Sequence, residues 1–313
     1  LVFGNSRRTF AELDARVNGL ANGLLKLRLE KGDRVGMLMN NCNEFIEVDF
    51  ALAKTGLVRV PLNARLLEAD HEYVLNDAGA RVLIFGAEHA DTVAAIRERL
   101  PTVKHFILIT RNSSTSASFG CHAYEALRES ASSEEPGVSV DEQDLHTLFY
   151  TSGTTGKPKG VMLTQKSWSN VVINLALDYG PIETEDILLN TQLLSHGAGF
   201  FVLPFFIFGA TNMLMARADP QSIFETIQRE KVTVLKLVPS ILYQLMQFPT
   251  KTQYDLSSLK TIIYGGSPIA VPRLVEALQF FGPKLVKLYG QAEVPICIRK
   301  KKKKDHVWEG PAE

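Results

Sequence analysis

The sequence has little cysteine and no net charge. Its three cysteines, Cys42, Cys121 and Cys297, lie far apart in 313 residues and form no CxxC pair. That spacing fits a reducing compartment better than a disulfide framework, and without clustered histidines it predicts no structural zinc. The 34 basic residues balance the 34 acidic residues, so no overall field would attract nucleic acid or anionic lipid. We therefore expect a cytoplasmic protein that binds no nucleic acid and holds any charged ligand through local groups.

The sequence also lacks a clear membrane segment. No basic start leads into a short apolar run at Leu1, so we expect a chain entered partway and not a signal peptide. The stretch from Gly197 to Ala216 is long enough to span a bilayer, but Pro204 and Thr211-Asn212 interrupt it. We expect a buried helix leading into a strand there, with membrane contact as the alternative and no transmembrane segment elsewhere.

Helical and strand patterns alternate along almost the whole chain. Thr9 and Glu12 form an expected capping box for a helix that continues to about Lys26, and residues 33–62 read as one strand–helix–strand unit. Further strands are expected at 80–86, 105–110, 146–150, 160–164, 232–238, 259–266 and 284–290, and further helices at 69–77, 87–100, 165–177, 221–230, 239–248 and 270–281. This alternation predicts an α/β fold.

The composition changes once along the chain. Residues 111–144 are rich in Ser, Gly and Glu, which is typical of a connector. We therefore expect a first α/β subdomain at 1–110, a connector at 111–144 and a second α/β subdomain at 145–313.

One loop has the composition of a phosphate site. The stretch Tyr150 to Gly160, "YTSGTTGKPKG", lies between two apolar strands. Glycines permit close backbone approach to an anion, hydroxyls donate hydrogen bonds and lysines supply charge. The glycines are Gly153, Gly156 and Gly160; the hydroxyl residues are Thr151, Ser152, Thr154 and Thr155; the lysines are Lys157 and Lys159.

This loop is not a Walker A motif. That motif requires G-x-x-x-x-G-K-[ST], but Thr151 stands at the first glycine position and Pro158 follows Lys157. The next element also reads as a strand, whereas a P-loop opens into a helix. The spacing therefore contradicts a P-loop NTPase. The alternative interpretation is a flexible Gly/Ser/Thr linker. The flanking apolar strands and the two lysines argue against it.

The same residues resemble a known family. Leu148 to Gly160, "LFYTSGTTGKPKG", is similar at every position to the phosphate-binding signature of adenylate-forming enzymes, which include acyl-CoA synthetases, aryl-CoA ligases, luciferases and peptide-synthetase adenylation domains. Residues 9–24, 31–63 and 76–85 also resemble the amino-terminal part of acyl-CoA synthetases. The resemblance implies the large amino-terminal domain of that fold, with stacked, mostly parallel sheets flanked by helices. It implies an incomplete AMP-binding domain over 1–313, with the small carboxyl-terminal domain absent.

The resemblance also implies roles for the loop. The residues from Thr151 to Gly156, with Lys159, would bind the β- and γ-phosphates of ATP; these are Thr151, Ser152, Gly153, Thr154, Thr155, Gly156 and Lys159. Lys159 would also act in catalysis.

Two later segments match the nucleotide site of the family. "YGGSPI" places Gly265, Gly266 and Ser267 beside the adenine and acyl pockets, although a Gly-Gly turn often serves only as a helix entry. "LYGQAEVP" resembles the family's Y-G-x-T-E motif. Tyr289 and Gly290 would bind adenine, and Glu293 would be a catalytic residue that brings a carboxylate to Mg²⁺.

One residue departs from the family's motif, and the bare sequence gives other roles to two residues. Ala292 stands where the family usually has threonine, and the loss of one hydrogen bond to a charged group costs about 1.5 to 3 kcal/mol. Without the resemblance, Glu293 reads as a surface acid and His196 as a satisfied core histidine. With it, His196, Gly266 and Gln291 would contact the acyl substrate.

The implied activity is that of an acid–thiol ligase with ATP, Mg²⁺ and coenzyme A. A carboxylic acid would form an acyl-adenylate with release of pyrophosphate, and a thiol would then displace AMP. The apolar run 200–208 suits an aliphatic or an aromatic acid, and the resemblance to acyl-CoA synthetases favours a fatty acid. An aryl-CoA ligase or a non-catalytic adenylate-binding module are the alternatives. The family's catalytic lysine of adenylation would lie after Glu313, so we expect these residues alone to bind nucleotide with little full activity. A homodimer is left open.

One strong charge block remains, from Arg299 to Lys304. A solvated loop is the simpler reading, and contact with the phosphates of coenzyme A or an anionic membrane surface is the alternative.

Overall fold

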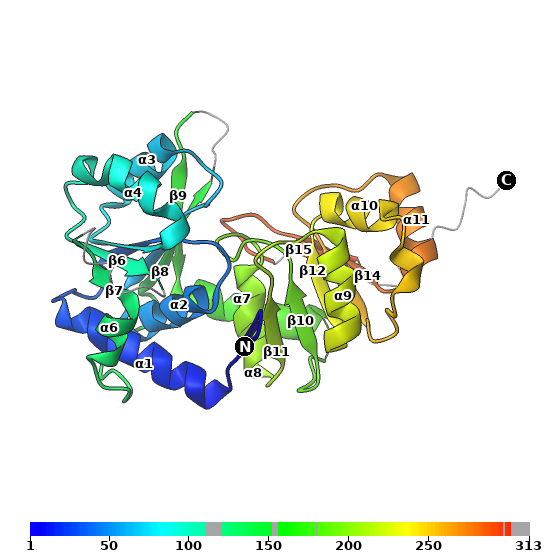
Figure 1. Cartoon of the computed structure of the whole chain (residues 1–313), viewed down its shortest axis with the longest axis horizontal. Helices are drawn as coiled ribbons and strands as arrows, with labels where there is room; N and C mark the ends of the chain where they lie inside the picture. The colour runs from blue at the N-terminus through cyan, green and yellow to red at the C-terminus, as the bar shows by residue number, and fades with distance from the viewer. Residues whose placement is uncertain (111–119, 152–155, 180, 297, 302–313) are drawn as a thin grey trace. The chain divides into compact units, whose positions relative to one another are not determined.

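The protein folds as two compact units (Figure 1). The computed structural model describes residues 1–110, 120–151, 156–179, 181–296 and 298–301. The first unit comprises Leu1 and Arg7–Asn170, and the second comprises Val2–Ser6 and Val171–Glu313. From the sequence we expected the second subdomain to begin at residue 145. In the structure, residues 145–170 belong to the first unit.

The first unit is built on a seven-stranded sheet with strand order β7-β6-β5-β3-β4-β8-β9. Neighbouring strands are parallel except β8 and β9, which form an antiparallel pair. Figure 1 shows α3 and α4 on one side of this sheet and α1, α2 and α6 on the other. The strands are β3 (Arg34–Leu38), β4 (Val58–Pro61), β5 (Val82–Gly86), β6 (His105–Ile109), β7 (His122–Ala123), β8 (Leu145–Thr151) and β9 (Lys159–Thr164); the helices are α1 (Phe10–Lys26), α2 (Asn43–Thr55), α3 (Glu68–Ala78), α4 (Ala90–Ile96) and α6 (Tyr124–Glu129).

Local signals account for the first elements. The Thr9 side chain accepts a hydrogen bond from the Glu12 amide while Glu12 accepts one from Thr9, which confirms the predicted capping box of α1. Helix α2 ends at Gly56, which takes a left-handed conformation with φ 67° that glycine adopts without steric cost. Strands β3 and β4 are parallel on either side of α2, so the predicted strand–helix–strand unit is confirmed.

Two stretches differ from their sequence patterns. Residues 87–100 form α4 between two short 3₁₀ segments, Ala87–His89 and Arg97–Arg99, and not one continuous helix. Part of the stretch 111–144, read as a connector, forms β7 and α6, and Tyr124 of α6 is fully buried.

The second unit is built on an eight-stranded sheet with strand order β15-β14-β13-β12-β10-β11-β1-β2. The pairs from β14 to β1 are parallel, and β15 is antiparallel to β14. The strands are β1 (Val2–Phe3), β2 (Ser6–Arg7), β10 (Ile187–Asn190), β11 (Thr211–Leu214), β12 (Val234–Leu237), β13 (Thr261–Tyr264), β14 (Leu285–Tyr289) and β15 (Ile298–Lys301); the helices are α7 (Gln165–Tyr179, entering from the first unit), α8 (Val202–Ile207), α9 (Pro220–Glu230), α10 (Pro239–Gln247) and α11 (Val271–Phe281), with short 3₁₀ segments η3 (Gly199–Phe201) and η4 (Lys251–Gln253).

The long apolar stretch 197–216 is part of this second unit. It forms η3, α8 and then β11, which confirms the predicted buried helix leading into a strand. Pro204 and Phe205 of α8 are buried. Across the described residues, the structure contains no helix with both the length and the apolarity needed to cross a membrane.

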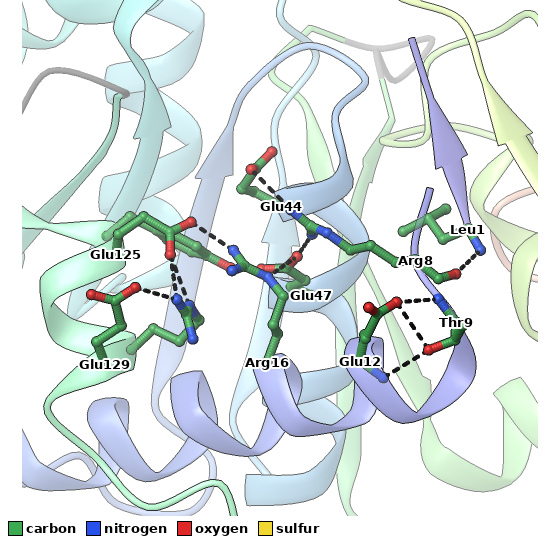
Figure 2. A network of polar contacts seen from close by, with 11 residues as sticks. Leu1, Arg8, Thr9, Glu12, Arg16, Glu44, Glu47, Glu125 and Glu129 are labelled. Carbon is green, nitrogen blue, oxygen red and sulfur yellow. Dashed lines mark hydrogen bonds and ion pairs between the residues drawn. The ribbon is translucent and has the colours of Figure 1, made fainter. Parts of the chain in front are cut away.

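A buried carboxylate ties three helices of the first unit together (Figure 2). Glu47 of α2 is fully buried and accepts hydrogen bonds from Arg16 Nε of α1 at 2.8 Å and from the Tyr124 hydroxyl of α6 at 2.8 Å. Arg8 forms a further ion pair with Glu47. Arg16 also donates to Glu125 of α6 at 2.6 Å. A buried charge is tolerated only when it is paired and hydrogen-bonded, and these partners meet that requirement.

We predict that Glu47→Gln lowers the free energy of unfolding of the first unit by about 3 kcal/mol, because two arginines lose a buried counter-charge. Glu129→Gln is the matched control: Glu129 is exposed and pairs with Arg128, so we expect a change within about 0.5 kcal/mol. Urea denaturation of both variants measures the difference. Equal, small effects would mean that the network does not stabilise the unit.

Candidate functional site

The signature loop connects the two antiparallel strands β8 and β9 of the first unit. Tyr150 pairs with Gly160 and Thr151 with Lys159, so the two ends of the loop are hydrogen-bonded neighbours. Ser152, Gly153, Thr154 and Thr155, which were predicted to bind phosphate, lie outside the described residues. Thr151 is partly buried, whereas Gly156, Lys157 and Lys159 are exposed. The described ends of the loop therefore present both lysines to solvent.

Helix α3 holds the ends of this loop. The Tyr73 hydroxyl donates a hydrogen bond to the Pro158 carbonyl oxygen at 3.2 Å, and the Tyr150 hydroxyl donates to Asp77 Oδ2 at 2.6 Å. Burial, together with the bond to Asp77, raises the pKa of Tyr150. Lys157 Nζ lies 5.3 Å from the centre of the Tyr73 ring, within the range of a cation–π contact. Both ends of the loop are thus fixed to one helix.

Glycine is favoured at positions 156 and 160 of the loop for different structural reasons. Gly156 has φ 125°, a backbone conformation that other residues rarely adopt. At Gly160, a Cβ atom would lie 3.0 Å from the Tyr150 ring, so a side chain there would displace the tyrosine that bonds to Asp77. The sequence assigned Gly160 to phosphate approach; that stays a prediction, and the close Tyr150 ring is an additional reason for glycine at this position.

The other predicted site residues meet at one edge of the second unit's sheet. Strands β14, β13, β12 and β10 are successive neighbours and are parallel, so their carboxyl ends lie along the same edge. The segments that follow these strand ends carry Gly265, Gly266 and Ser267 after β13, Gly290, Gln291 and Glu293 after Tyr289 of β14, and His196 after β10. The sheet therefore gathers residues from positions 196 to 293 that the sequence separates widely.

Close backbone packing explains two glycines at this edge. A Cβ atom at Gly265 would lie 2.6 Å from the Leu288 carbonyl oxygen, and one at Gly290 would lie 2.6 Å from the Ile296 amide nitrogen. Gly266 has φ 89°, whereas the space around it is open apart from Val238. The turn after β13 thus leaves exposed backbone at Gly266 and Ser267, where a flat ligand could approach without steric hindrance.

The polar and aromatic residues of this edge face solvent. The Tyr289 side chain is 52% exposed, and Gln291 and Glu293 are exposed as well. His196 is exposed and its Nδ1 lies 3.0 Å from Ser195 Oγ, so it is not the buried core histidine of the simpler sequence reading. Ala292 is half-buried. An exposed aromatic face, a carboxylate and a histidine at one sheet edge are suited to binding a polar ligand that has an aromatic ring.

One charged residue at this edge was missed by the sequence reading. Lys236 of β12 is only 5% exposed, and burial lowers the pKa of its ammonium group to about 8. Its Nζ donates to Gln192 Oε1 at 3.1 Å and lies 5.3 Å from the Phe201 ring. The sequence did contain a signal for this residue, namely a lysine within the apolar strand "VTVLKLV". Strands that are buried on both faces are usually apolar throughout.

The end of the chain is described only in part. Strand β15 includes Ile298–Lys301, whereas the rest of the basic run to Lys304 lies outside the described residues, as does Cys297.

Comparison with known proteins identifies similar sequences. The family model described as "AMP-binding enzyme" matches residues 1–310. A feruloyl-CoA synthase of Amycolatopsis is 34% identical over 292 residues, which are 93% of this chain and 55% of the relative. The medium/long-chain-fatty-acid–CoA ligase FadD8 of Mycobacterium tuberculosis is 34% identical over 98% of this chain and 54% of its own length. The chain thus spans about half the length of these relatives.

Solved structures share the fold. The inhibitor-bound N-terminal domain of FACL13 from Mycobacterium tuberculosis aligns with a TM-score of 0.83 and 30% identity, over 93% of this chain and 72% of that one. The anthranilate CoA ligase AuaEII with anthranoyl-AMP aligns with a TM-score of 0.89 over 97% of this chain and 58% of that one, at 22% identity. The predicted α/β fold, with mostly parallel sheets flanked by helices, is therefore confirmed.

We predict that Lys236→Met stabilises the second unit at neutral pH. The pKa of Lys236 falls from 10.5 to about 8 on folding, which corresponds to a cost on the order of 3 kcal/mol while the amine is charged. Between pH 8 and 10.5 the unfolded chain binds more protons at this residue, so the unfolding free energy of the unsubstituted chain should rise relative to the variant. Chemical denaturation of both proteins at pH 7 and pH 10 measures the gap. A gap that does not shrink with pH would contradict a buried, charged Lys236.

Proposed function

The chain belongs to the AMP-binding enzyme family, and from that premise we propose that it binds ATP and a carboxylic acid as part of an AMP-forming acid–thiol ligase. The observation that carries this proposal is the complete signature from Leu148 to Gly160, placed on a hairpin whose ends are fixed to α3. The carboxyl edge of the second sheet supplies the exposed ring, carboxylate and histidine that an adenylate and its acyl group require.

The reaction would begin when the acid's carboxylate attacks the α-phosphorus of ATP. This step gives an acyl-adenylate and releases pyrophosphate, and a thiol then displaces AMP to form the thioester. The main barrier in the first step is the approach of two anions, so charge neutralisation and positioning contribute most of the catalysis. The loop hydroxyls and Lys159 would hold the β- and γ-phosphates, and Lys159 is exposed.

The nucleotide's base would bind at the edge of the second sheet. Tyr289 offers a half-exposed aromatic face for stacking on adenine, beside the close-packed Gly290 and the open backbone of Gly266 and Ser267. Glycine at these positions lets a flat ring approach the backbone. Gly265 supports this geometry through its close contact with Leu288.

Glu293 fits the metal that ATP carries. Mg²⁺ prefers oxygen ligands, and among the described residues the exposed Glu293 carboxylate forms no hydrogen bond or ion pair. A bound Mg²⁺ would neutralise phosphate charge. Glu293 would hold it as one ligand, with ATP oxygens supplying others.

The acid substrate would bind beside His196. The apolar run 200–208 suits an aliphatic or an aromatic acid, and a relative named medium/long-chain-fatty-acid–CoA ligase supports a fatty acid. A relative named feruloyl-CoA synthase supports the aryl-CoA alternative. His196, Gly266 and Gln291 would position the acyl group, and coenzyme A would be the thiol. A cytoplasmic location and a homodimer remain predictions.

A non-catalytic adenylate-binding module is the second candidate function. Ala292 favours it, because the hydroxyl of the family's usual threonine is missing beside Glu293. ATP–pyrophosphate exchange by the whole protein separates the two candidates, since a module that only binds would give none.

We predict that Lys159→Ala weakens binding of ATP·Mg²⁺ at least about tenfold, because a charge-assisted contact to phosphate is lost. Isothermal titration calorimetry on this chain measures the dissociation constant. Lys166→Ala is the matched control: Lys166 belongs to the same unit but pairs with Glu142 at 2.9 Å on the surface. An unchanged dissociation constant in the Lys159 variant would contradict the assigned phosphate site.

We further predict that Ala292→Thr strengthens ATP binding by about tenfold, through one added hydrogen bond to a charged group. Ala292→Val is the control, since valine has the shape of threonine without its hydroxyl. Fluorescence titration with a labelled ATP analogue compares the three proteins. If valine and threonine have the same effect, hydrogen bonding at position 292 does not contribute.

A further inference from the structure

The two faces of the second unit's sheet differ in polarity. Leu189, Leu235, Leu237 and Tyr264 share one face and pack into the apolar core with α9, α10 and α11. The residues that alternate with them point to the opposite face. We call this opposite face the polar face, because it carries the buried polar residues Asn190, Asn212, Thr261 and Lys236.

Segments η3 and α8 cover this polar face. The Asn212 side-chain amide donates to the Val202 carbonyl oxygen at the start of α8 at 3.0 Å, and the Phe201 ring of η3 lies over Lys236 Nζ. The chain enters η3 directly from His196 and Gly197. The segment that covers the polar face therefore follows directly, in the chain, the residues assigned to the acyl group.

Among the residues that the structure describes, none places a counter-charge beside the Lys236 ammonium on this face. Its contacts among the described residues are neutral: Gln192 Oε1 at 3.1 Å, the Leu237 carbonyl oxygen at 3.5 Å and the Phe201 ring. An ammonium buried without an anion is costly, and chains normally pair such a group.

A second polar group beside it is also unsatisfied. Asn190 is the cross-strand register partner of Lys236 and is fully buried. Its amide nitrogen donates to Asn212 Oδ1 at 3.3 Å, but in the described part of the chain its Oδ1 has no hydrogen-bond partner. Buried polar atoms in native structures are usually bonded, so an acceptor and a cation left incomplete side by side indicate a place for a polar ligand group.

The position of Lys236 decides which end of a ligand it would meet. Gly266, Ser267 and Glu293 follow the strand ends and are exposed, whereas Lys236 lies within β12 and is nearly inaccessible. A carboxylate that reacts at the exposed edge would leave the remainder of its acid directed inward, toward η3 and the polar face. The Lys236 ammonium would then meet the tail of the acid and not its reacting carboxylate.

We propose that Lys236, together with Asn190, binds an oxygen on the tail of the acid substrate. The preferred substrates are acids whose tail carries a carboxylate, phenolic or hydroxyl oxygen, over acids of the same length that lack it. This inference rests on the proposed function and narrows its substrate class. It also gives a reason for keeping a lysine that destabilises the strand, because residues of binding sites often reduce stability.

The test uses non-hydrolysable acyl-sulfamoyl adenosine analogues in matched pairs. One series has alkyl tails of graded length that end in a methyl or a carboxylate group, and the other compares cinnamoyl with 4-hydroxycinnamoyl. Calorimetry on this chain should give at least about tenfold tighter binding for the oxygen-bearing member of at least one pair. The series in which the preference occurs distinguishes a carboxylate from a phenolic oxygen.

Variants connect the preference to the residue. Lys236→Met and Lys236→Gln should bind both members of the pair with similar affinity, whereas Lys231→Met should keep the preference. Lys231 is an exposed lysine of the same unit that pairs with Asp255. Circular dichroism and thermal melting establish whether each variant is folded. If Lys236→Met is unfolded, Lys236→Gln is used for the comparison in its place.

The outcomes separate this inference from the proposed function. If oxygen-free analogues bind and the added oxygen gives no gain in any pair, Lys236 does not recognise the tail, and the ligase proposal stands. A preference that survives in both Lys236 variants also overturns the inference. If neither ATP·Mg²⁺ nor any analogue binds, both proposals fail.

Discussion

The candidate site depends on one constraint, the parallel pairing of strands. In the second unit, β10, β12, β13 and β14 run in the same direction, so every strand delivers the residues after it to a single edge. An antiparallel arrangement would send alternate connections to opposite edges. His196, Gly266, Tyr289 and Glu293 are assembled by this geometry although as many as 97 positions of sequence separate them. The same strands also set the alternation that places Lys236 and Asn190 on the face opposite the apolar core of α9, α10 and α11.

The fold was predictable because its signals are local. The capping box at Thr9, the glycine at the end of α2 and the alternation of apolar runs each need only a few neighbouring residues. The signature loop was found for the same reason. Glu47 could not be identified this way, because its partners Arg16 and Tyr124 come from distant elements that meet only after folding. The buried role of Tyr124 likewise could not be read from its Ser-rich surroundings.

The site was predictable only in part. Resemblance supplied Tyr289 and Glu293, and the structure places them on one edge as exposed groups. Lys236 is visible in the sequence as a lysine within an apolar strand. Its environment could not be predicted, because its neutral partners Gln192 and Phe201 come from other segments of the chain. At Gly160 the structure adds a second reason for glycine, because a Cβ atom there would lie 3.0 Å from the Tyr150 ring. A residue type indicates chemistry, whereas its neighbours decide whether that chemistry is used.

We propose that adenine binds at the carboxyl edge of the second sheet, beside Tyr289. Photolabelling of this chain with 8-azido-ATP, followed by mass spectrometry of the labelled peptides, tests this placement. We expect label on the segments after β13 and β14, residues 265–270 or 289–296, and we expect excess unlabelled ATP to prevent it. Label that is competed by ATP but falls on other segments, such as α9 or α10, would contradict it.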